Sequence, residues 1–256
     1  MSGLAVADRI TELLGEFKLG VAAAEMVPRL VQAGHDDALG HIVEVLELEA
    51  QGRRERRVGR LLKASKLPPA KTFATLDESR VPRPALAKVR QLAGGDFVER
   101  AENVLFFGLP GVGKSHLASA LGHSLVEAGH SVLFTPTYQL VQHLLAARRD
   151  LALPRALRGL DVFDAIILDD LGYVQQTADE AEVLFTLMAE RYERRSLIIT
   201  SNLVFSDWDR IFKSPMTTQA AIDRLVHHAH IIEINRKTSV RAEEAKKRNA
   251  KAEAEP

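Results

Sequence analysis

The sequence lacks cysteine altogether, which excludes a disulfide scaffold, thiol catalysis and a cysteine zinc site. Aromatic residues make up only 5% of the 256 residues, which gives little support for single-strand recognition by base stacking. The formal net charge is zero, so a uniformly basic coat for nucleic acid is excluded. No apolar run reaches the roughly 18–20 residues that span a bilayer, and the N-terminus lacks the basic-then-apolar layout of a signal peptide. We therefore expect a soluble, cytoplasmic protein without a membrane partner.

Basic and acidic residues are segregated along the chain although they are equal in number. Residues 53–66 hold seven bases and one acid, whereas residues 161–193 hold nine acids and one base. Four of the arginines recur at the i, i+3, i+4 and i+7 spacing that places them on one face of a helix. Such a face is either solvated or contacts nucleic-acid phosphates without reading the sequence, and the scarcity of nearby acids favours the phosphate contact. The predicted DNA-binding residues are Arg53, Arg54, Arg56, Arg57, Arg60 and Lys63.

Apolar periodicity predicts a helical N-terminal region followed by alternating strands and helices. Residues 4–66 are expected to be helical, and the proline pair at positions 68 and 69 should end that region. Further along, five short apolar strands separated by helices predict a parallel sheet that is covered on both faces. The expected strands are residues 103–107, 131–135, 163–168, 196–200 and 230–234.

The most specific motif is Gly108-Leu-Pro-Gly-Val-Gly-Lys-Ser115, which matches the phosphate-binding loop G-x-x-x-x-G-K-[ST]. An expected strand precedes the motif and an expected helix follows it. A glycine-rich turn that matched the motif by chance would not need these flanking elements. Glycines let backbone N–H groups curl around phosphate, and the helix N-terminus adds its positive dipole end. Lys114 would contact the β- and γ-phosphates, and the Ser115 hydroxyl would ligate Mg²⁺. We predict ATP and Mg²⁺ as cofactors, with nucleotide contacts from Gly108, Pro110, Gly111, Val112, Gly113, Lys114, Ser115 and His116.

Two carboxylates end a second apolar strand, in the sequence Ala-Ile-Ile-Leu-Asp169-Asp170. A nucleoside triphosphatase needs a carboxylate here to hold the Mg²⁺ hydration shell, and we assign that role to Asp169. We assign polarisation of the attacking water to Asp170. The alternative is a plain loop turn, which Asp-Asp-Leu-Gly sequences commonly form. Asn202 follows the next strand, where open α/β sheets bind their ligands, so it is placed to hydrogen-bond the γ-phosphate or the water.

Four segments together resemble the AAA+ ATPases of the IstB family, the helper proteins of insertion-sequence transposases and relatives of the DnaC and DnaI helicase loaders. They are G-L-P-G-V-G-K-S-H-L-A, I-I-L-D-D-L-G, I-I-T-S-N-L and A-A-I-D-R-L-V-H-H-A-H. The arginine-rich run before the core also resembles the family's lead-in, and the resemblance covers residues 38–235. It implies an AAA+ sheet of order 5-1-4-3-2 and a homo-oligomer with ATP at its subunit interfaces. It further implies that Asn202 senses the γ-phosphate and that Arg224 is an arginine finger reaching the neighbouring subunit.

The sequence departs from the family pattern in two places. Asp170 stands where most AAA+ proteins have Glu, and its shorter side chain predicts slow hydrolysis. The helical lid that usually follows the core is not expected, because only residues 235–256 remain and they are mostly polar, which leaves Arg241 as a weak candidate for a lid arginine. We divide the chain into an N-terminal helical, arginine-rich region (1–69), a connector (70–100), an AAA+ core (101–235) and a charged tail (236–256).

The resemblance implies an Mg²⁺-dependent, DNA-stimulated ATPase that assembles on double-stranded DNA without marked sequence preference. It would help a transposase with target selection and strand transfer. The alternative is a helicase loader, which would carry a helicase-binding helical domain in place of the arginine-rich face. A metabolic kinase is disfavoured, because no motif for an acceptor pocket is present.

Two further features are not assigned to a site. The histidines near the end of the core have no carboxylate or cysteine close to them in sequence, so a surface or capping role is favoured over metal binding. Trp208 is expected to be a packing residue. The histidines concerned are His227, His228 and His230.

Overall fold

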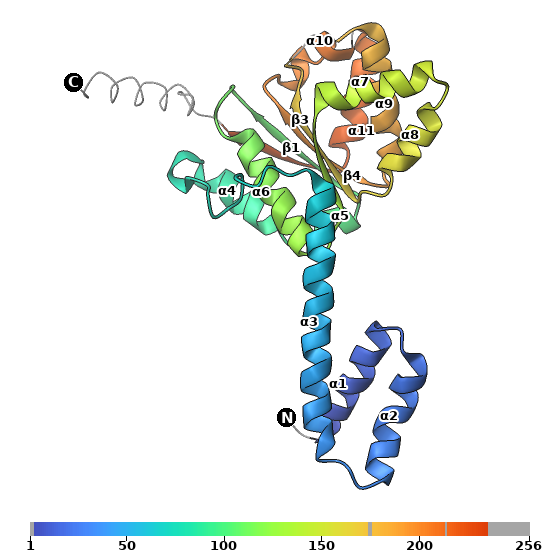
Figure 1. Cartoon of the computed structure of the whole chain (residues 1–256). Coiled ribbons are helices and arrows are strands. Elements are labelled where there is room, and N and C mark those ends of the chain that lie inside the picture. The colour runs from blue at the N-terminus through green and yellow to red at the C-terminus, as the bar shows by residue number, and fades with distance from the viewer. Residues whose placement is uncertain (1–2, 174–175, 213, 235–256) are drawn as a thin grey trace, which may run out of the picture. The chain divides into compact units, whose positions relative to one another are not determined.

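Figure 1 shows a computed structural model of the chain, which describes residues 3–173, 176–212 and 214–234. The expected tail at 236–256, including Arg241, lies outside the described residues. The chain divides into two compact units, Met1–Arg60 and Leu61–Pro256. The division falls within helix α3 (Ala38–Ser65), whereas the expected N-terminal region ran to residue 69. Within the described residues, every helix is too short or too polar to span a bilayer.

Three helices build the first unit. They are α1 (Gly3–Glu16), α2 (Gly20–Gln32) and most of α3 (Ala38–Ser65). Ile10 and Leu14 of α1 are buried together with Leu39 of α3, and the apolar residues of α2 pack against them. Apolar residues at helical spacing thus give a small core, as the periodicity of residues 4–66 predicted.

A five-stranded parallel sheet of order β2-β3-β4-β1-β5 forms the centre of the second unit. Read from the other edge, this is the predicted order 5-1-4-3-2, which is confirmed together with the AAA+ fold class. The strands are almost continuously apolar because both faces of the sheet are covered. They are β1 (Asn103–Gly108), β2 (Val132–Pro136), β3 (Ala165–Leu171), β4 (Ser196–Ser201) and β5 (Ala229–Ile234).

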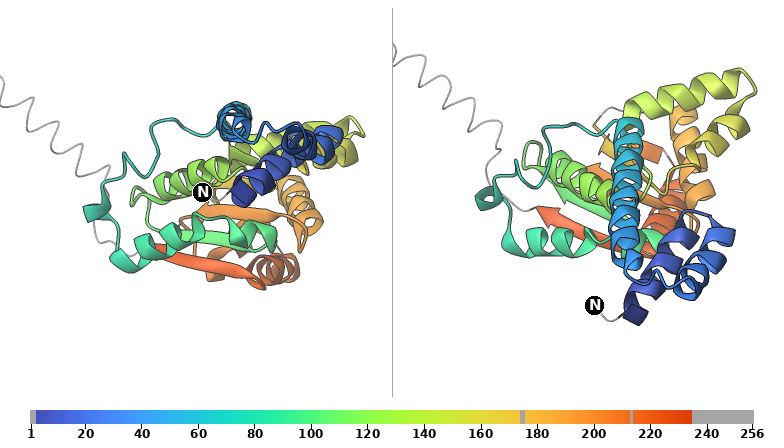
Figure 2. Two further views of the ribbon diagram at one scale, coloured as in Figure 1. Left: turned by 90° about the horizontal axis from the view of Figure 1, so that it is seen from below. Right: turned by 60° about the horizontal axis from the view of Figure 1, so that its bottom comes forward.

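Helices cover both faces of this sheet (Figure 1 and Figure 2). On one face, α6 (Lys114–Glu127) packs against β1 to β4, and α4 (Arg83–Leu92) packs against α6 and β5. On the other face, α9 (Ala178–Arg191) lies between α7 (Thr137–Arg149) and α11 (Pro215–Val226). The shorter helices are η1 (Glu78–Arg80), α5 (Asp96–Glu99), α8 (Leu153–Leu160), η2 (Phe205–Asp207) and α10 (Asp209–Phe212).

The segment expected to be a connector, residues 70–100, belongs to the second unit. Its helix α4 begins at Arg83, and Val89 and Leu92 of α4 are buried, as is Phe97 of α5. Helix α8 was not predicted; it has Pro154 in its first turn, where proline is tolerated.

Two side chains in the second unit fix the elements around the sheet. Trp208 is fully buried and packs against the rings of Phe205 and Phe212, which confirms its expected packing role. Arg191, the one base in the acidic segment, is 1% exposed and donates to the carbonyls of Leu160 and Ser196. Burial lowers its pKa to about 10, and its hydrogen bonds tie the end of α8 to the start of β4.

Candidate active site

The phosphate loop runs from the end of β1 to the start of α6, as predicted. Gly108 lies so close to β5 that a Cβ there would come within 2.6 Å of the Ile234 carbonyl oxygen. Gly113 has φ 105° and precedes α6, a conformation that side chains rarely adopt. In the part of the chain that the structure describes, no side chain caps α6, which leaves this helix N-terminus open to an anion on the loop side.

Lys114 is the first residue of α6 and is only 5% exposed. Its Nζ donates to the carbonyl oxygens of Gly108 and Leu109, at 2.7 and 3.0 Å. These contacts hold the ammonium group against the loop that would surround the phosphates. Its position therefore suits the predicted contact with β- and γ-phosphate oxygens.

A cleft of about 470 Å³ adjoins the loop and brings the predicted residues together. Lys114 and Ser115 line it from α6, Asp170 from β3, and Asn202 from just beyond β4. Parallel strands that end at one edge of the sheet explain this convergence. His116, another of the predicted nucleotide contacts, lines the cleft as well, together with Lys71 and Tyr173, which were not predicted.

A local irregularity separates the two adjacent carboxylates of β3. The register of β3 against β4 shifts between Leu168 and Leu171, and Asp170 has φ 58°. This left-handed residue is exposed and lines the cleft, whereas Asp169 is 8% exposed and does not. Strained non-glycine residues cluster at functional sites, where they aim a side chain. The geometry thus suits different roles for the two carboxylates.

The buried hydroxyl of Thr200 fixes both carboxylate residues. Thr200 Oγ1 donates to Asp169 Oδ1 at 2.6 Å and accepts the N–H of Asp170 at 2.9 Å. Thr137 Oγ1 donates to the carbonyl oxygen of Asp169 at 2.9 Å. Thr200 was not predicted, although its place at the carboxyl end of the strand next to β3 was a usable signal. Thr200 is therefore a positioning residue for the acidic pair.

The donor atoms at this site fit Mg²⁺. Ser115 offers a hydroxyl, and Asp169 and Asp170 offer carboxylates, so all the ligands are the hard oxygens that this ion prefers. The Thr200 contact engages one oxygen of Asp169 and orients the other. We keep Ser115 and Asp169 as the predicted metal ligands.

We expect Thr200→Val to lower kcat for ATP hydrolysis by about tenfold to a hundredfold, the usual cost of losing a partner that orients a metal ligand. Valine keeps the volume of threonine, but it frees the Asp169 carboxylate and leaves the Asp170 N–H without its acceptor. KM for ATP should change little, because the phosphate loop is untouched. Steady-state kinetics would measure the split between kcat and KM.

Ser201→Ala is the matched control, since Ser201 is buried in the same strand and its hydroxyl donates to Leu171 instead. Thr200→Ser should restore most of the activity because it restores the hydroxyl. An equal fall in Thr200→Val and Ser201→Ala would show general damage to β4 and contradict the positioning role.

Arg224 does not reach the cleft of its own chain. It lies in the last turn of α11, where Nη1 donates to the Ala220 carbonyl and the guanidinium lies 5.2 Å from the ring centre of Phe185. Among the described residues it forms no ion pair with Asp223, its neighbour in the sequence. Its role toward a neighbouring subunit remains a prediction.

The six predicted DNA-binding residues all lie on α3 and are exposed. Glu49 hydrogen-bonds Arg53 at 2.6 Å and Arg56 at 3.2 Å, and Arg53 also lies over the ring of Phe17. The acid count from residue 53 onward left out Glu49, which lies one helical turn earlier. Two of the arginines are therefore ion-paired with a carboxylate of the same helix. DNA binding by this face remains a prediction.

Comparison with known proteins identifies the family. A family model described as IstB-like ATP binding protein matches residues 14–249. The chain belongs to this family. An insertion sequence ATP-binding protein of Sinorhizobium fredii is 49% identical over 192 residues, which cover 75% of this chain and 64% of the relative. The IS21 insertion sequence ATP-binding protein of Pseudomonas aeruginosa is 42% identical over 189 residues, covering 74% of this chain and 71% of the relative.

The solved structures show the same fold. AMPPCP-bound DnaA from Aquifex aeolicus superposes with a TM-score of 0.57 at 17% identity, covering 73% of this chain and 57% of DnaA. The family model and the insertion-sequence relatives confirm the predicted resemblance to the IstB family. The aligned chain spans less than two thirds of the Sinorhizobium fredii relative, so the activity and partners of the whole protein remain proposals.

Proposed function

We propose that this IstB-like protein is a slow, Mg²⁺-dependent ATPase that assembles on double-stranded DNA in the cytoplasm and assists a transposase during insertion-sequence transposition. The main support is the cleft, in which Lys114, Ser115, Asp170 and Asn202 converge beside a phosphate loop. The names of the relatives, which link ATP binding to insertion sequences, support the transposition context.

Each residue of the cleft has a separate role in ATP hydrolysis. Loop N–H groups and Lys114 bind the triphosphate, and Asn202 donates a hydrogen bond to a γ-phosphate oxygen. Asp170 accepts a hydrogen bond from the water that attacks the γ-phosphorus. As the new P–O bond forms, the bond from the γ-phosphorus to the β–γ bridging oxygen breaks, ADP leaves, and the protons of the water remain with the inorganic phosphate. Mg²⁺, when held by Ser115 and Asp169, supplies positive charge that offsets the charge developing on the phosphates. Aspartate is one methylene shorter than glutamate and holds the water less well, which makes turnover slow.

The arginine-rich face of α3 supplies the contact with DNA. Its exposed guanidinium groups recur at helical spacing and would follow a phosphate backbone. Nothing in this pattern reads base edges, so the contact is independent of sequence. The choice of target then belongs to the transposase.

We expect the quadruple variant Arg53→Ala, Arg56→Ala, Arg57→Ala, Arg60→Ala to bind duplex DNA more weakly and with a smaller salt dependence. The slope of log K against log salt should fall by about 0.9 for each phosphate that is no longer neutralised, so by up to about 3.6. Glu49 already engages Arg53 and Arg56, so the fall will be smaller if those two stay paired in the complex. Fluorescence anisotropy across a salt series measures the slope.

The matched control replaces the same four arginines by lysine, which keeps the charge and should keep most of the slope. Circular dichroism checks that α3 remains helical in both variants. An unchanged slope in the alanine variant would mean that this face is merely solvated. If ATP turnover persists without any duplex binding, the helicase-loader alternative is favoured.

A further inference from the structure

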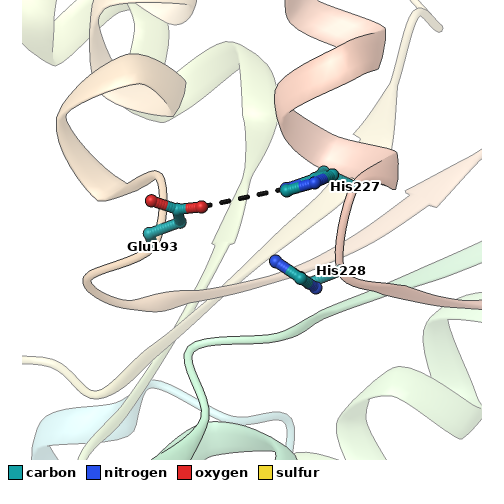
Figure 3. Close-up of side chains that lie close together, drawn as sticks. All are labelled: Glu193, His227 and His228. Carbon is teal, nitrogen blue, oxygen red and sulfur yellow. Dashed lines mark ion pairs between the residues drawn. The ribbon is translucent and has the colours of Figure 1, made fainter.

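Three side chains of metal-ligand type lie close together at the edge of the second unit (Figure 3). Glu193 comes from the turn between α9 and β4, while His227 and His228 come from the end of α11. One ligand atom of each lies within 4.8 Å of the others, the one such group among the residues that the structure describes. A metal site was disfavoured from the sequence because no carboxylate is near the histidines along the chain. The fold, however, brings Glu193 to them from a distant part of the chain.

A buried asparagine holds the two turns that carry these residues. Asn103, 7% exposed at the start of β1, accepts the N–H of Leu197 with its side-chain oxygen and donates to the Leu225 carbonyl. Its own backbone N–H donates to the carbonyl of His228 at 2.8 Å. The beginning of β4 and the end of α11 are thereby fixed to the same residue. The backbone under the cluster is therefore preorganised.

The carboxylate of Glu193 is aimed at the histidines. Glu193 has φ 55°, an uncommon conformation for a residue with a side chain, and its Oε1 lies 3.8 Å from His227 Nδ1. The adjacent arginines pair with other acids: Arg194 with Asp161 and Glu190, and Arg195 with Asp164. The hydroxyl of Tyr192 lies 3.0 Å from Nδ1 of His227, so a metal ion bound through this nitrogen would replace that contact.

We propose that Glu193, His227 and His228 bind a transition-metal ion of the Zn²⁺ class. Two imidazoles and one carboxylate form a common zinc donor set, and three protein ligands leave a fourth position open. Zn–N and Zn–O bonds of about 2.0–2.1 Å require donor atoms roughly 3.3 Å apart. The Glu193–His227 pair is already close to that separation, and exposed side chains can close the rest by small rotations. The ion would link the α9–β4 turn to the end of α11.

The experiment is a titration of the full-length, metal-free protein with Zn²⁺ by calorimetry, with Mg²⁺ and ADP in excess to fill the phosphate site. We expect one Zn²⁺ per chain. Glu193→Gln and His228→Ala should each weaken binding by about tenfold or more, since even outer-shell partners contribute that much. Titration with Co²⁺ should give the visible absorption of a tetrahedral complex, and His228→Ala should lose it.

His41→Ala is the matched control, because His41 is an exposed histidine of α3 that lies 3.9 Å from Glu44 and belongs to no three-ligand group among the described residues. This variant should bind Zn²⁺ as the parent does. Zn²⁺ should also raise the Tm of the parent but not that of His228→Ala. A cooperative thermal transition in His228→Ala would show that this variant is folded and has lost only the metal site. Equal Zn²⁺ affinity in the parent, Glu193→Gln and His228→Ala would overturn the proposal, as would no binding by the parent.

Discussion

Lys114→Ala is expected to weaken ATP binding more than a hundredfold and to abolish ATP-dependent assembly. The ammonium group lies against the phosphate loop, where it hydrogen-bonds the carbonyls of Gly108 and Leu109. Charged hydrogen bonds to phosphate contribute about 1.5–3 kcal/mol each, so losing the ammonium costs about 3 kcal/mol or more. A fluorescent-nucleotide titration measures the affinity, and light scattering with and without ATP measures the assembly.

Lys71→Ala is the matched control, because Lys71 lines the same cleft but lies outside the loop. It removes an identical charge, and its effect on affinity should stay below about tenfold, the scale of a partly exposed ionic contact. Thermal unfolding of both variants checks that the fold is kept. Full ATP affinity and assembly in Lys114→Ala would refute the assignment of the phosphate loop.

The parts of the site that could be predicted were those encoded locally. The glycines and Lys114 follow one another in a motif whose geometry is fixed by the strand before it and the helix after it. Asp170 and Asn202 could be predicted to lie at the same edge of the sheet because parallel strands end there, and both residues line the cleft. Sheet order followed from the family resemblance and agrees with the structure.

The parts that were missed depend on how distant segments pair. Thr200 acts on Asp169 only because β3 and β4 are neighbours with a register shift at this point, which no local pattern encodes. Glu193 reaches the histidines only because α9 and α11 pack side by side. Glu49 was overlooked because the charge run was counted from its first arginine, whereas pairing on a helix reaches back one turn.

Arg224→Ala is expected to reduce ATP turnover by about 10³–10⁵, the range typical of arginine fingers, while leaving ATP binding nearly intact. Arg224 lies away from its own cleft, so we expect its effect on turnover to act at the site of an adjacent subunit. Its present contacts, the Ala220 carbonyl and the face of Phe185, are weak ones that a phosphate oxygen can replace. Arg194→Ala is the matched control, since that exposed arginine pairs with acids of its own chain and should leave turnover near the parental value.

A mixture of Arg224→Ala with Lys114→Ala separates a finger that acts between subunits from a purely internal role. Arg224→Ala keeps a functional phosphate loop but lacks the finger, whereas Lys114→Ala keeps the finger but has an inactive nucleotide site. Lys114→Ala does not assemble alone, so the test requires that it joins an assembly through partners that hold ATP. With random mixing, about a quarter of the head-to-tail interfaces would then join a functional site to an intact finger. Turnover should therefore recover to at most about a quarter of the parental rate, although neither variant is active alone. Affinity-tagged subunits establish that the two variants assemble together in ATP; no recovery despite such assembly would rule out a finger acting between subunits.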